Sequence, residues 1–349
     1  MTESQIEQST DAAGRSGAAE LEFRNVSKHY DGAAQPAITD LSLTVRAGEV
    51  CVLVGPSGCG KTTAMRMVNR MTDLTSGDIL VGGRSVTGRD PAQLRREIGY
   101  VIQQIGLFPH LSIAHNITMV PRLLGWAKPR MRKRAEELLE LVGLPAEMAK
   151  RYPSQLSGGQ RQRVGVARAL AADPPLMLMD EPFGAIDPIN RENLQNQFLR
   201  LQSEIRKTVV FVTHDIDEAI KMGDRIVILR EGGHLVQYDT PDNILANPAD
   251  EFVAQFVGAD RGLKRLALKT VGEIALVDAA GRPVDGAAQV EPGTSQTVTA
   301  DTSLRDALSQ MMSDSMAPLM VVDNDGAPCG YVTLDALHEA LSSPVGAGR

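Results

Sequence analysis

One pattern constrains the fold of this chain more than any other: residues 55–62 read GPSGCGKT. The pattern follows the apolar run Cys51–Val54, which is typical of a strand buried on both faces, and a helical pattern continues from Lys61 to about Met71. Glycines allow a backbone to wrap closely around a phosphate group, and the N-terminus of the helix adds a positive partial charge. The order strand, glycine loop and helix therefore predicts an α/β fold that begins with a phosphate-binding loop.

The side chains of this loop suit a nucleotide and its metal ion. Lys61 supplies a mobile cation for the β- and γ-phosphates, and Thr62 supplies a hydroxyl for Mg²⁺. We expect the loop to bind ATP with Mg²⁺. The expected nucleotide-binding residues are Gly55, Pro56, Ser57, Gly58, Cys59, Gly60, Lys61, Thr62 and Thr63.

A second strand ends in two carboxylates. Residues 176–179 are apolar and lead directly into Asp180 and Glu181, about 120 residues after the glycine loop. A carboxylate at the end of this strand can hold Mg²⁺, which is the role we expect for Asp180. Glu181 lies just beyond and is expected to orient and activate a water molecule, as the catalytic base.

A second phosphate cradle is predicted at residues 156–160, which read LSGGQ and open a helix over about 160–172. One ATP already has its loop at 55–62, so a second cradle in one domain is useful only if two copies of the chain meet head to tail. An ordinary helix N-cap, the plain alternative, needs only Ser157. The cradle would consist of Ser157, Gly158, Gly159 and Gln160.

Together, these three motifs resemble those of an ABC-transporter ATPase, and the resemblance covers residues 20–258. It implies an α/β P-loop domain with a helical subdomain at about 104–175 and an antiparallel β-subdomain. It also implies four further site residues. Tyr30 would stack on adenine, and His214 would contact the γ-phosphate. Gln103 would link the γ-phosphate and Mg²⁺ to the membrane partner. Asp187 would lie in the D-loop.

Plain alternatives exist for several of these residues: a surface tyrosine, a solvated glutamine and a histidine that happens to end a strand. The D-loop, residues 184–187, has Ile186 where Leu is usual in the family. We expect the replacement to be harmless, because both side chains fill an apolar position.

A narrower resemblance is to the importers of osmoprotectants, which take up glycine betaine, choline, carnitine or proline betaine. The strings that carry it include IGYVIQQIGLFPHLSI and VQYDTPDNILANP. It implies a peripheral subunit at the cytoplasmic face of the plasma (inner) membrane. Its partners would be a second copy of itself, transmembrane permease subunits and, through the permease, a substrate-binding protein. The alternative within this class is an importer of amino acids or another small solute.

The C-terminal part of the chain resembles a CBS module over residues 297–342. The pattern predicts a strand from Val298, a helix from Leu304, strands at 319–322 and 330–333, and a final helix to about Leu341. Nucleotide-binding CBS modules usually place Asp three residues after Thr, whereas Thr333 is followed at that distance by Ala336. We therefore expect a small α+β module with a regulatory or dimerising role.

The remaining segments and the charge set further expectations. Residues 1–19 and 343–349 are expected to be tails, the first disordered, and residues 259–296 a linker or degenerate segment. Residues 270–349 contain 11 acidic and 3 basic side chains, so the rest of the chain is nearly neutral. A neutral body argues against a nucleic-acid-binding protein. No apolar run approaches the ~18 residues that cross a bilayer.

Two rival classes fit less well. Soluble ABC ATPases that act on ribosomes or in DNA repair usually carry two ATPase domains or a long coiled-coil insertion, and this sequence has neither. A purely regulatory CBS protein does not explain the complete set of ATPase motifs.

The three cysteines indicate a reducing compartment without disulfides. We expect Cys51 to be buried in its strand. Cys59 lies beside Lys61 and the start of a helix, a setting that favours the thiolate.

Overall fold

The computed structural model of the chain describes residues 17–102, 106–184, 186–278, 282, 296–313, 316–323 and 325–342. The chain forms two compact units, residues 1–238 and 239–349. Each unit has a hydrophobic core of its own. Gln103 and Ala185 lie outside the described residues.

The first unit contains a six-stranded sheet with the order β10-β9-β3-β8-β7-β6. Five of its strands pair in parallel, and β3 and β8 are buried along their whole length, as their apolar sequences predict. Strands that run in parallel all end at one edge of the sheet. The five parallel strands are β3 (Val50–Val54), β6 (Ile98–Val101), β7 (Leu176–Asp180), β8 (Thr208–Val212) and β9 (Arg225–Arg230), and β10 (His234–Asp239) completes the sheet.

A second, four-stranded sheet has the order β2-β1-β4-β5. In it β1 pairs antiparallel with both β2 and β4, which confirms the predicted antiparallel subdomain. Helix α1 (Lys61–Val68) contributes buried residues to the core that also holds residues of both sheets. The strands are β1 (Leu21–Lys28), β2 (Ile38–Val45), β4 (Ser76–Val81) and β5 (Arg84–Ser85).

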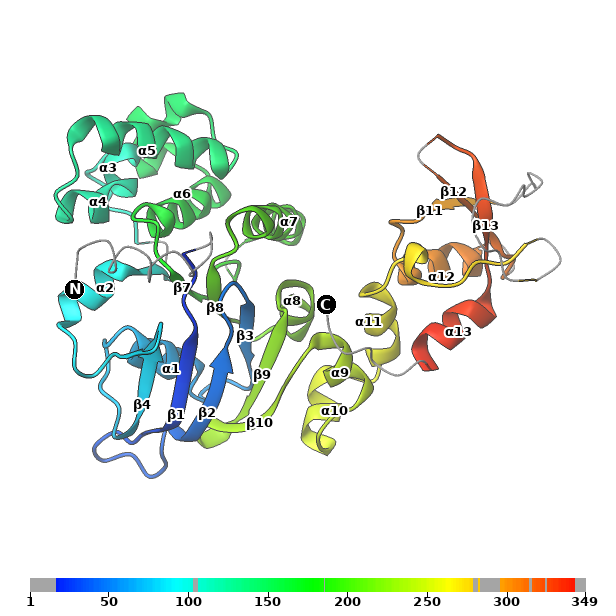
Figure 1. Cartoon of the computed structure of the whole chain (residues 1–349), viewed down its shortest axis with the longest axis horizontal. Coiled ribbons are helices and arrows are strands. Elements are labelled where there is room, and N and C mark those ends of the chain that lie inside the picture. The colour runs from blue at the N-terminus through cyan, green and yellow to red at the C-terminus, as the bar shows by residue number, and fades with distance from the viewer. Residues whose placement is uncertain are drawn as a thin grey trace, which may run out of the picture. The chain divides into compact units, whose positions relative to one another are not determined.

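Helices α3 to α6 of the first unit form a separate group between β6 and β7 in the chain. Figure 1 shows α3 to α6 gathered at one end of this unit, away from β1, β2 and β4, which confirms the predicted helical subdomain. Helix α5 buries Ala135, Leu138 and Leu139 at helical spacing. The helices of this unit after α1 are α2 (Pro91–Glu97), α3 (Ile113–Ile117), α4 (Met119–Leu123), α5 (Lys128–Leu141), α6 (Gly158–Leu170), α7 (Pro188–Ile205) and α8 (Ile216–Met222).

The second unit ends in the strand and helix order that the sequence predicts for a CBS-like module. Its three strands have the order β11-β12-β13, with β11 parallel to β12 and β12 antiparallel to β13. The Thr333 hydroxyl accepts the backbone N–H of Ala336 at 3.2 Å and so caps the last helix. The elements are β11 (Thr297–Thr299), α12 (Leu304–Ser313), β12 (Leu319–Val322), β13 (Pro328–Val332) and α13 (Leu334–Ser342).

The second unit starts with three helices, α9 (Pro241–Ala246), α10 (Glu251–Val257) and α11 (Arg261–Ala267). Helix α11 lies in the segment that we expected to be a linker. It is ordered because Leu266 joins the core of this unit, while the buried guanidinium of Arg265 donates to the Asp242 carboxylate and to the Leu341 carbonyl. The domain boundary at residue 258 stays a prediction.

Candidate functional site

The register of the six-stranded sheet brings the candidate residues to one edge. Within it Leu53 of β3 pairs with Val212 of β8, and Val212 pairs with Asp180 of β7. The segments that follow these three positions are the glycine loop, the His214 turn and Glu181. Motifs distant in the sequence therefore meet beyond the carboxyl ends of the strands, where ligands bind in open α/β sheets.

The glycine loop needs glycine where it enters helix α1. Gly60 has a φ of 97° and caps the helix, and a Cβ there would lie 2.2 Å from the Ala37 carbonyl oxygen. No other residue fits without moving the backbone. The loop is thus held against the start of β2.

Lys61 turns its ammonium into the glycine loop. Its Nζ donates to the carbonyls of Gly55 at 2.7 Å and Pro56 at 3.0 Å, and the residue is only 7% exposed. These acceptors are neutral, so they orient the cation without cancelling its charge. A buried cation held this way favours a bound anion such as a phosphate.

Two side-chain oxygens that could bind a cation lie side by side next to this loop. The Thr62 hydroxyl donates to Oδ1 of Asp180 at 3.3 Å. Burial raises the pKa of Asp180, and the Thr62 hydrogen bond opposes that rise. A bound divalent cation would favour the ionised carboxylate at this half-buried position.

These residues fit Mg²⁺, which binds proteins through one or two carboxylates and takes its other oxygens from phosphate and water. No group of three or more His, Cys, Asp or Glu side chains suited to a metal occurs in the described part of the chain. A two-oxygen site completed by a nucleotide is therefore the fitting arrangement, with the assignment of Thr62, Asp180 and Gln103 as ligands still a prediction.

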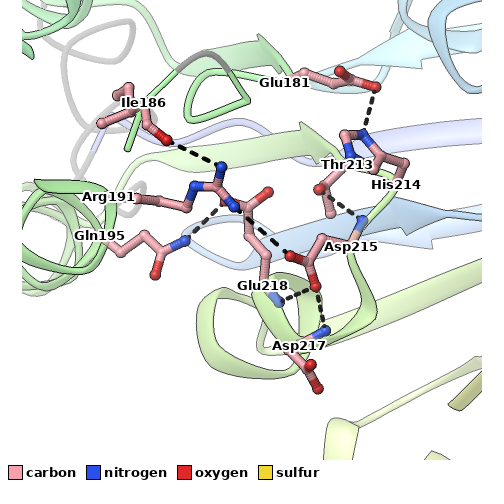
Figure 2. Close-up of polar contacts among 9 residues, drawn as sticks. All are labelled: Glu181, Ile186, Arg191, Gln195, Thr213, His214, Asp215, Asp217 and Glu218. Carbon is pink, nitrogen blue, oxygen red and sulfur yellow. Dashed lines mark hydrogen bonds and ion pairs between the residues drawn. The ribbon is translucent and has the colours of Figure 1, made fainter. Parts of the chain in front are cut away.

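Glu181 and His214 face each other across β7 and β8. His214 Nδ1 lies 3.2 Å from Glu181 Oε1. Figure 2 shows the two side chains pointing toward each other. The backbone N–H of Glu181 donates to the Val212 carbonyl at 2.9 Å, and Glu181 has a φ of 44°, in the left-handed region that is uncommon outside glycine. The turn thus aims the carboxylate towards His214 rather than along the strand.

A polar network supports His214 from the side of helices α7 and α8 (Figure 2). Asp215 caps α8, because its Oδ1 accepts the N–H groups of Asp217 at 2.9 Å and Glu218 at 3.3 Å. The N–H of Asp215 donates to the Thr213 hydroxyl at 3.1 Å. These bonds fix the backbone on both sides of His214.

Sequence reasoning missed this network. Asp215 followed three residues later by Glu218 is the spacing of a capping box, a signal that could have identified the start of α8. The contribution of Gln195 from α7 had no such signal. Its Nε2 donates to Glu218 Oε1 at 2.8 Å, and both side chains are buried; burial raises the pKa of Glu218.

The side chains of Ser157 and Gln160 cap the start of helix α6 in their own chain. Ser157 accepts the N–H of Gln160 at 3.3 Å, and Gln160 Oε1 accepts the N–H of Ser157 at 3.0 Å. Ser157 and Gly158 are exposed, with the start of α6 open to solvent. Capping and a second phosphate cradle are compatible, and the cradle stays a prediction.

The two remaining predicted site residues within the described part of the chain are Tyr30 and Asp187. The Tyr30 ring is 39% exposed and lies 4.8 Å from the Lys28 ammonium, in the loop that leads to Ala37 beside Gly60. The Asp187 carbonyl accepts the N–H of Arg191 at 2.9 Å at the start of α7.

The expected thiolate at Cys59 is wrong. Cys59 is fully buried, and burial raises the pKa of its thiol more than Lys61, 3.6 Å away, lowers it. Cys51 is also fully buried, which confirms the expectation for its strand, and burial raises its pKa as well.

Comparison with known proteins agrees with this arrangement. The family model described as ABC transporter matches residues 38–184, and the CBS domain model matches residues 294–343. The chain is 49% identical over 316 residues to the osmoprotectant import ATP-binding protein OsmV of Salmonella typhimurium, which covers 89% of this chain and 78% of that protein. The chain belongs to the family of ATP-binding proteins of ABC-type osmoprotectant importers.

Other members of this family are about equally similar. The choline transport ATP-binding protein OpuBA of Bacillus subtilis is 47% identical, covering 91% of this chain and 80% of that protein. The glycine betaine/carnitine/choline transport ATP-binding protein OpuCA of the same organism is 48% identical over the same shares.

Solved structures match the first unit. The dimeric ATP-binding cassette MJ0796 in a post-hydrolysis state bound to ADP and Pi has a TM-score of 0.57 and 34% identity, covering 63% of this chain and 98% of that one. A second dimeric structure of MJ0796 has the same TM-score at 35% identity. No helix of the described residues is both long and apolar enough to span a membrane.

Proposed function

We propose that this chain is the ATP-hydrolysing subunit of an importer for quaternary-amine osmoprotectants such as glycine betaine, choline or carnitine. The observation that carries the proposal is the 47–49% identity, over about nine-tenths of the chain, to proteins named for these solutes. The second support is the convergence of Lys61, Asp180, Glu181 and His214 at one edge of the sheet.

The mechanism follows from the groups at that edge. Lys61 binds the β- and γ-phosphates, and Thr62, Asp180 and Gln103 would hold the Mg²⁺ ion. Mg²⁺, when bound, neutralises charge on the phosphates. Glu181 accepts a proton from the attacking water, and the imidazole of His214 orients the Glu181 carboxylate and contacts the γ-phosphate. Tyr30 stacks on adenine.

The site is completed by a second copy of the chain. Ser157, with the N–H groups of Gly158, Gly159 and Gln160, faces the phosphates bound by the other copy, and Asp187 lies at the contact between copies. The dimeric state of the similar cassette MJ0796 supports this arrangement. The exposure of Ser157 and Gly158 supports it as well.

The import system adds transmembrane permease subunits and a substrate-binding protein, and the subunit lies at the cytoplasmic face of the plasma (inner) membrane. Uptake tests the proposal. The chain is reconstituted with its co-purifying permease in vesicles, and ATP-dependent uptake of labelled glycine betaine, choline and carnitine is compared with that of amino acids. Quaternary amines should be taken up with the native chain and not with Glu181→Gln, and uptake of amino acids alone would favour the alternative.

A further inference from the structure

Arg191 joins two loops that the mechanism uses. It lies on α7, one residue beyond a segment, 188–190, whose side chains are not described. One arm, Nη2, donates to the carbonyl of Ile186 at 3.1 Å, directly before Asp187. The other arm, Nη1, lies 4.0 Å from Oδ2 of Asp215, directly after His214. Figure 2 shows the guanidinium between these two acceptors.

The two partners of Arg191 differ in chemistry: the Ile186 carbonyl accepts a hydrogen bond, whereas the Asp215 carboxylate forms an ion pair at 4.0 Å. The Ile186 carbonyl belongs to the backbone, so its bond to Arg191 fixes the course of the loop that carries Asp187. The Asp215 carboxylate already accepts two N–H groups of α8 through Oδ1. Its second oxygen, Oδ2, faces Arg191 while the first holds the start of α8, directly after His214.

A second contact between α7 and α8, one helical turn further along α7, reinforces the connection between these two helices. Gln195 lies four residues after Arg191 on α7 and donates to the buried Glu218 of α8. The same two helices are thus joined at two successive turns. Arg191 is the member of this pair of bridges that also reaches the D-loop.

We propose that Arg191 is a positioning residue for hydrolysis: it holds the Ile186–Asp187 loop and the His214–Asp215 turn in a fixed relation. This inference rests on the proposed function, because it concerns the rate of ATP hydrolysis. One guanidinium thereby couples the Ile186–Asp187 loop, which is expected at the contact between two copies, to His214, which orients Glu181. A partner copy that moves the D-loop would displace His214 through Arg191.

The distances around Arg191 indicate that its replacement should change the catalytic rate rather than the stability of the fold. A half-exposed ion pair at 4.0 Å adds little to stability, so replacing Arg191 should leave the fold intact. A misplaced His214 should lower the catalytic rate without weakening nucleotide binding. The Arg191 side chain contacts Ile186 and Asp215, neither of which is expected to bind ATP.

The test uses the full-length chain with Arg191→Met, which keeps the length of the side chain and removes its charge and donors. We expect kcat for ATP hydrolysis to fall about tenfold or more, with KM for ATP nearly unchanged. Arg191→Lys, which can reach only one acceptor at a time, should be intermediate. The matched control is Lys221→Met, which removes another ion pair between α8 and α7, Lys221–Glu192 at 3.5 Å, without touching either loop.

Two further measurements separate positioning from a structural role. Arg191→Met combined with Asp215→Asn should lower kcat no more than the worse single variant, because both remove one coupling. Hydrogen exchange of peptides covering 182–187 and 213–218 should become faster together in Arg191→Met, and this readout needs no activity. Native kcat in Arg191→Met, an equal loss in Lys221→Met, or additive losses in the double variant would each overturn the inference. A native chain that hydrolyses no ATP would instead overturn the proposed function.

Discussion

Oε1 of Glu181 lies 3.2 Å from Nδ1 of His214. The contact arises because the Glu181 N–H binds the Val212 carbonyl, which places the residue after β7 beside the residue two positions after β8. Sheet register, rather than any local motif, therefore builds this pair.

Removing the imidazole should slow hydrolysis. His214→Ala leaves the Glu181 carboxylate without its orienting partner and removes a contact expected for the γ-phosphate, so we expect kcat to fall about 10²-fold or more. His338→Ala, an exposed histidine of α13, is the matched control and should behave as native. The measurement is steady-state ATPase activity of the full-length chain. Native kcat in His214→Ala would remove His214 from the mechanism.

The composite site can be tested at Ser157. Ser157→Arg should abolish hydrolysis while ATP binding to the single copy stays near native, because the lesion faces the ATP of the other copy. Ser157→Ala removes the same helix cap, at a cost of about 0.5–2 kcal/mol, without adding bulk, and should retain more activity.

Mixing variants sharpens this test. Lys61→Met disables the glycine loop of its own copy, whereas Ser157→Arg disables the site of its partner. An equimolar mixture contains dimers with one intact site, so it should hydrolyse ATP faster than either variant alone. Loss of ATP binding to Ser157→Arg as a single copy would contradict the head-to-tail site.

The three cysteines should differ in reactivity. Cys329 is partly exposed, whereas Cys51 and Cys59 are buried and burial raises the pKa of both thiols. Since the thiolate is the reactive form, a maleimide should label native protein at Cys329 first and at Cys59 slowly, with or without ATP. Mass spectrometry of labelled peptides measures this. Rapid labelling of Cys59 in the native chain would contradict its burial.

Glu218 should make stability depend on pH. Burial raises its pKa in the folded state above that in the unfolded state. Its contribution to stability is therefore complete below the unfolded-state pKa and is lost as the pH rises through the raised value. Glu218→Gln keeps an acceptor for Gln195 and cannot ionise, so its stability relative to the native chain should be greater at pH 7.5 than at pH 5.

Urea denaturation at the two pH values measures this difference. Glu192→Gln, an exposed carboxylate on α7, is the control and should show no such change. A stability difference between Glu218→Gln and the native chain that is the same at both pH values would contradict the raised pKa.

The sequence predicts much of this fold because its signals are local. Apolar runs locate β3 and β7, and the glycine loop can only follow a strand and precede a helix. The CBS-like module is found by the same alternation: its first four elements start within two residues of their predicted starts, and its last helix ends at Ser342, one residue beyond the predicted end. The sequence pattern did not predict helix α11. Its stability comes from the burial of Leu266 and Arg265 among residues distant in the sequence, and no local pattern records such contacts.

The sequence analysis named candidate site residues but not the residues that hold them in position. Lys61, Asp180 and Glu181 follow strands or begin a helix in recognisable strings. Arg191 and Gln195 act through contacts with residues some 20 positions away, so only the fold brings them to the site. Cys59 was misjudged because the cation beside it is visible in the sequence and its burial is not.

The central claim is that Glu181 is the base of an ATP-hydrolysing site shared by two copies. The variant Glu181→Gln tests it most directly, because the amide keeps the size of the side chain and cannot accept the proton of the attacking water. ATP turnover and gel filtration with ATP are measured for the native chain, for Glu181→Gln and for Glu192→Gln as control. We expect turnover to fall about 10²–10⁴-fold in Glu181→Gln, with ATP still bound and a dimer that persists in its presence. Near-native turnover in Glu181→Gln would contradict the central claim.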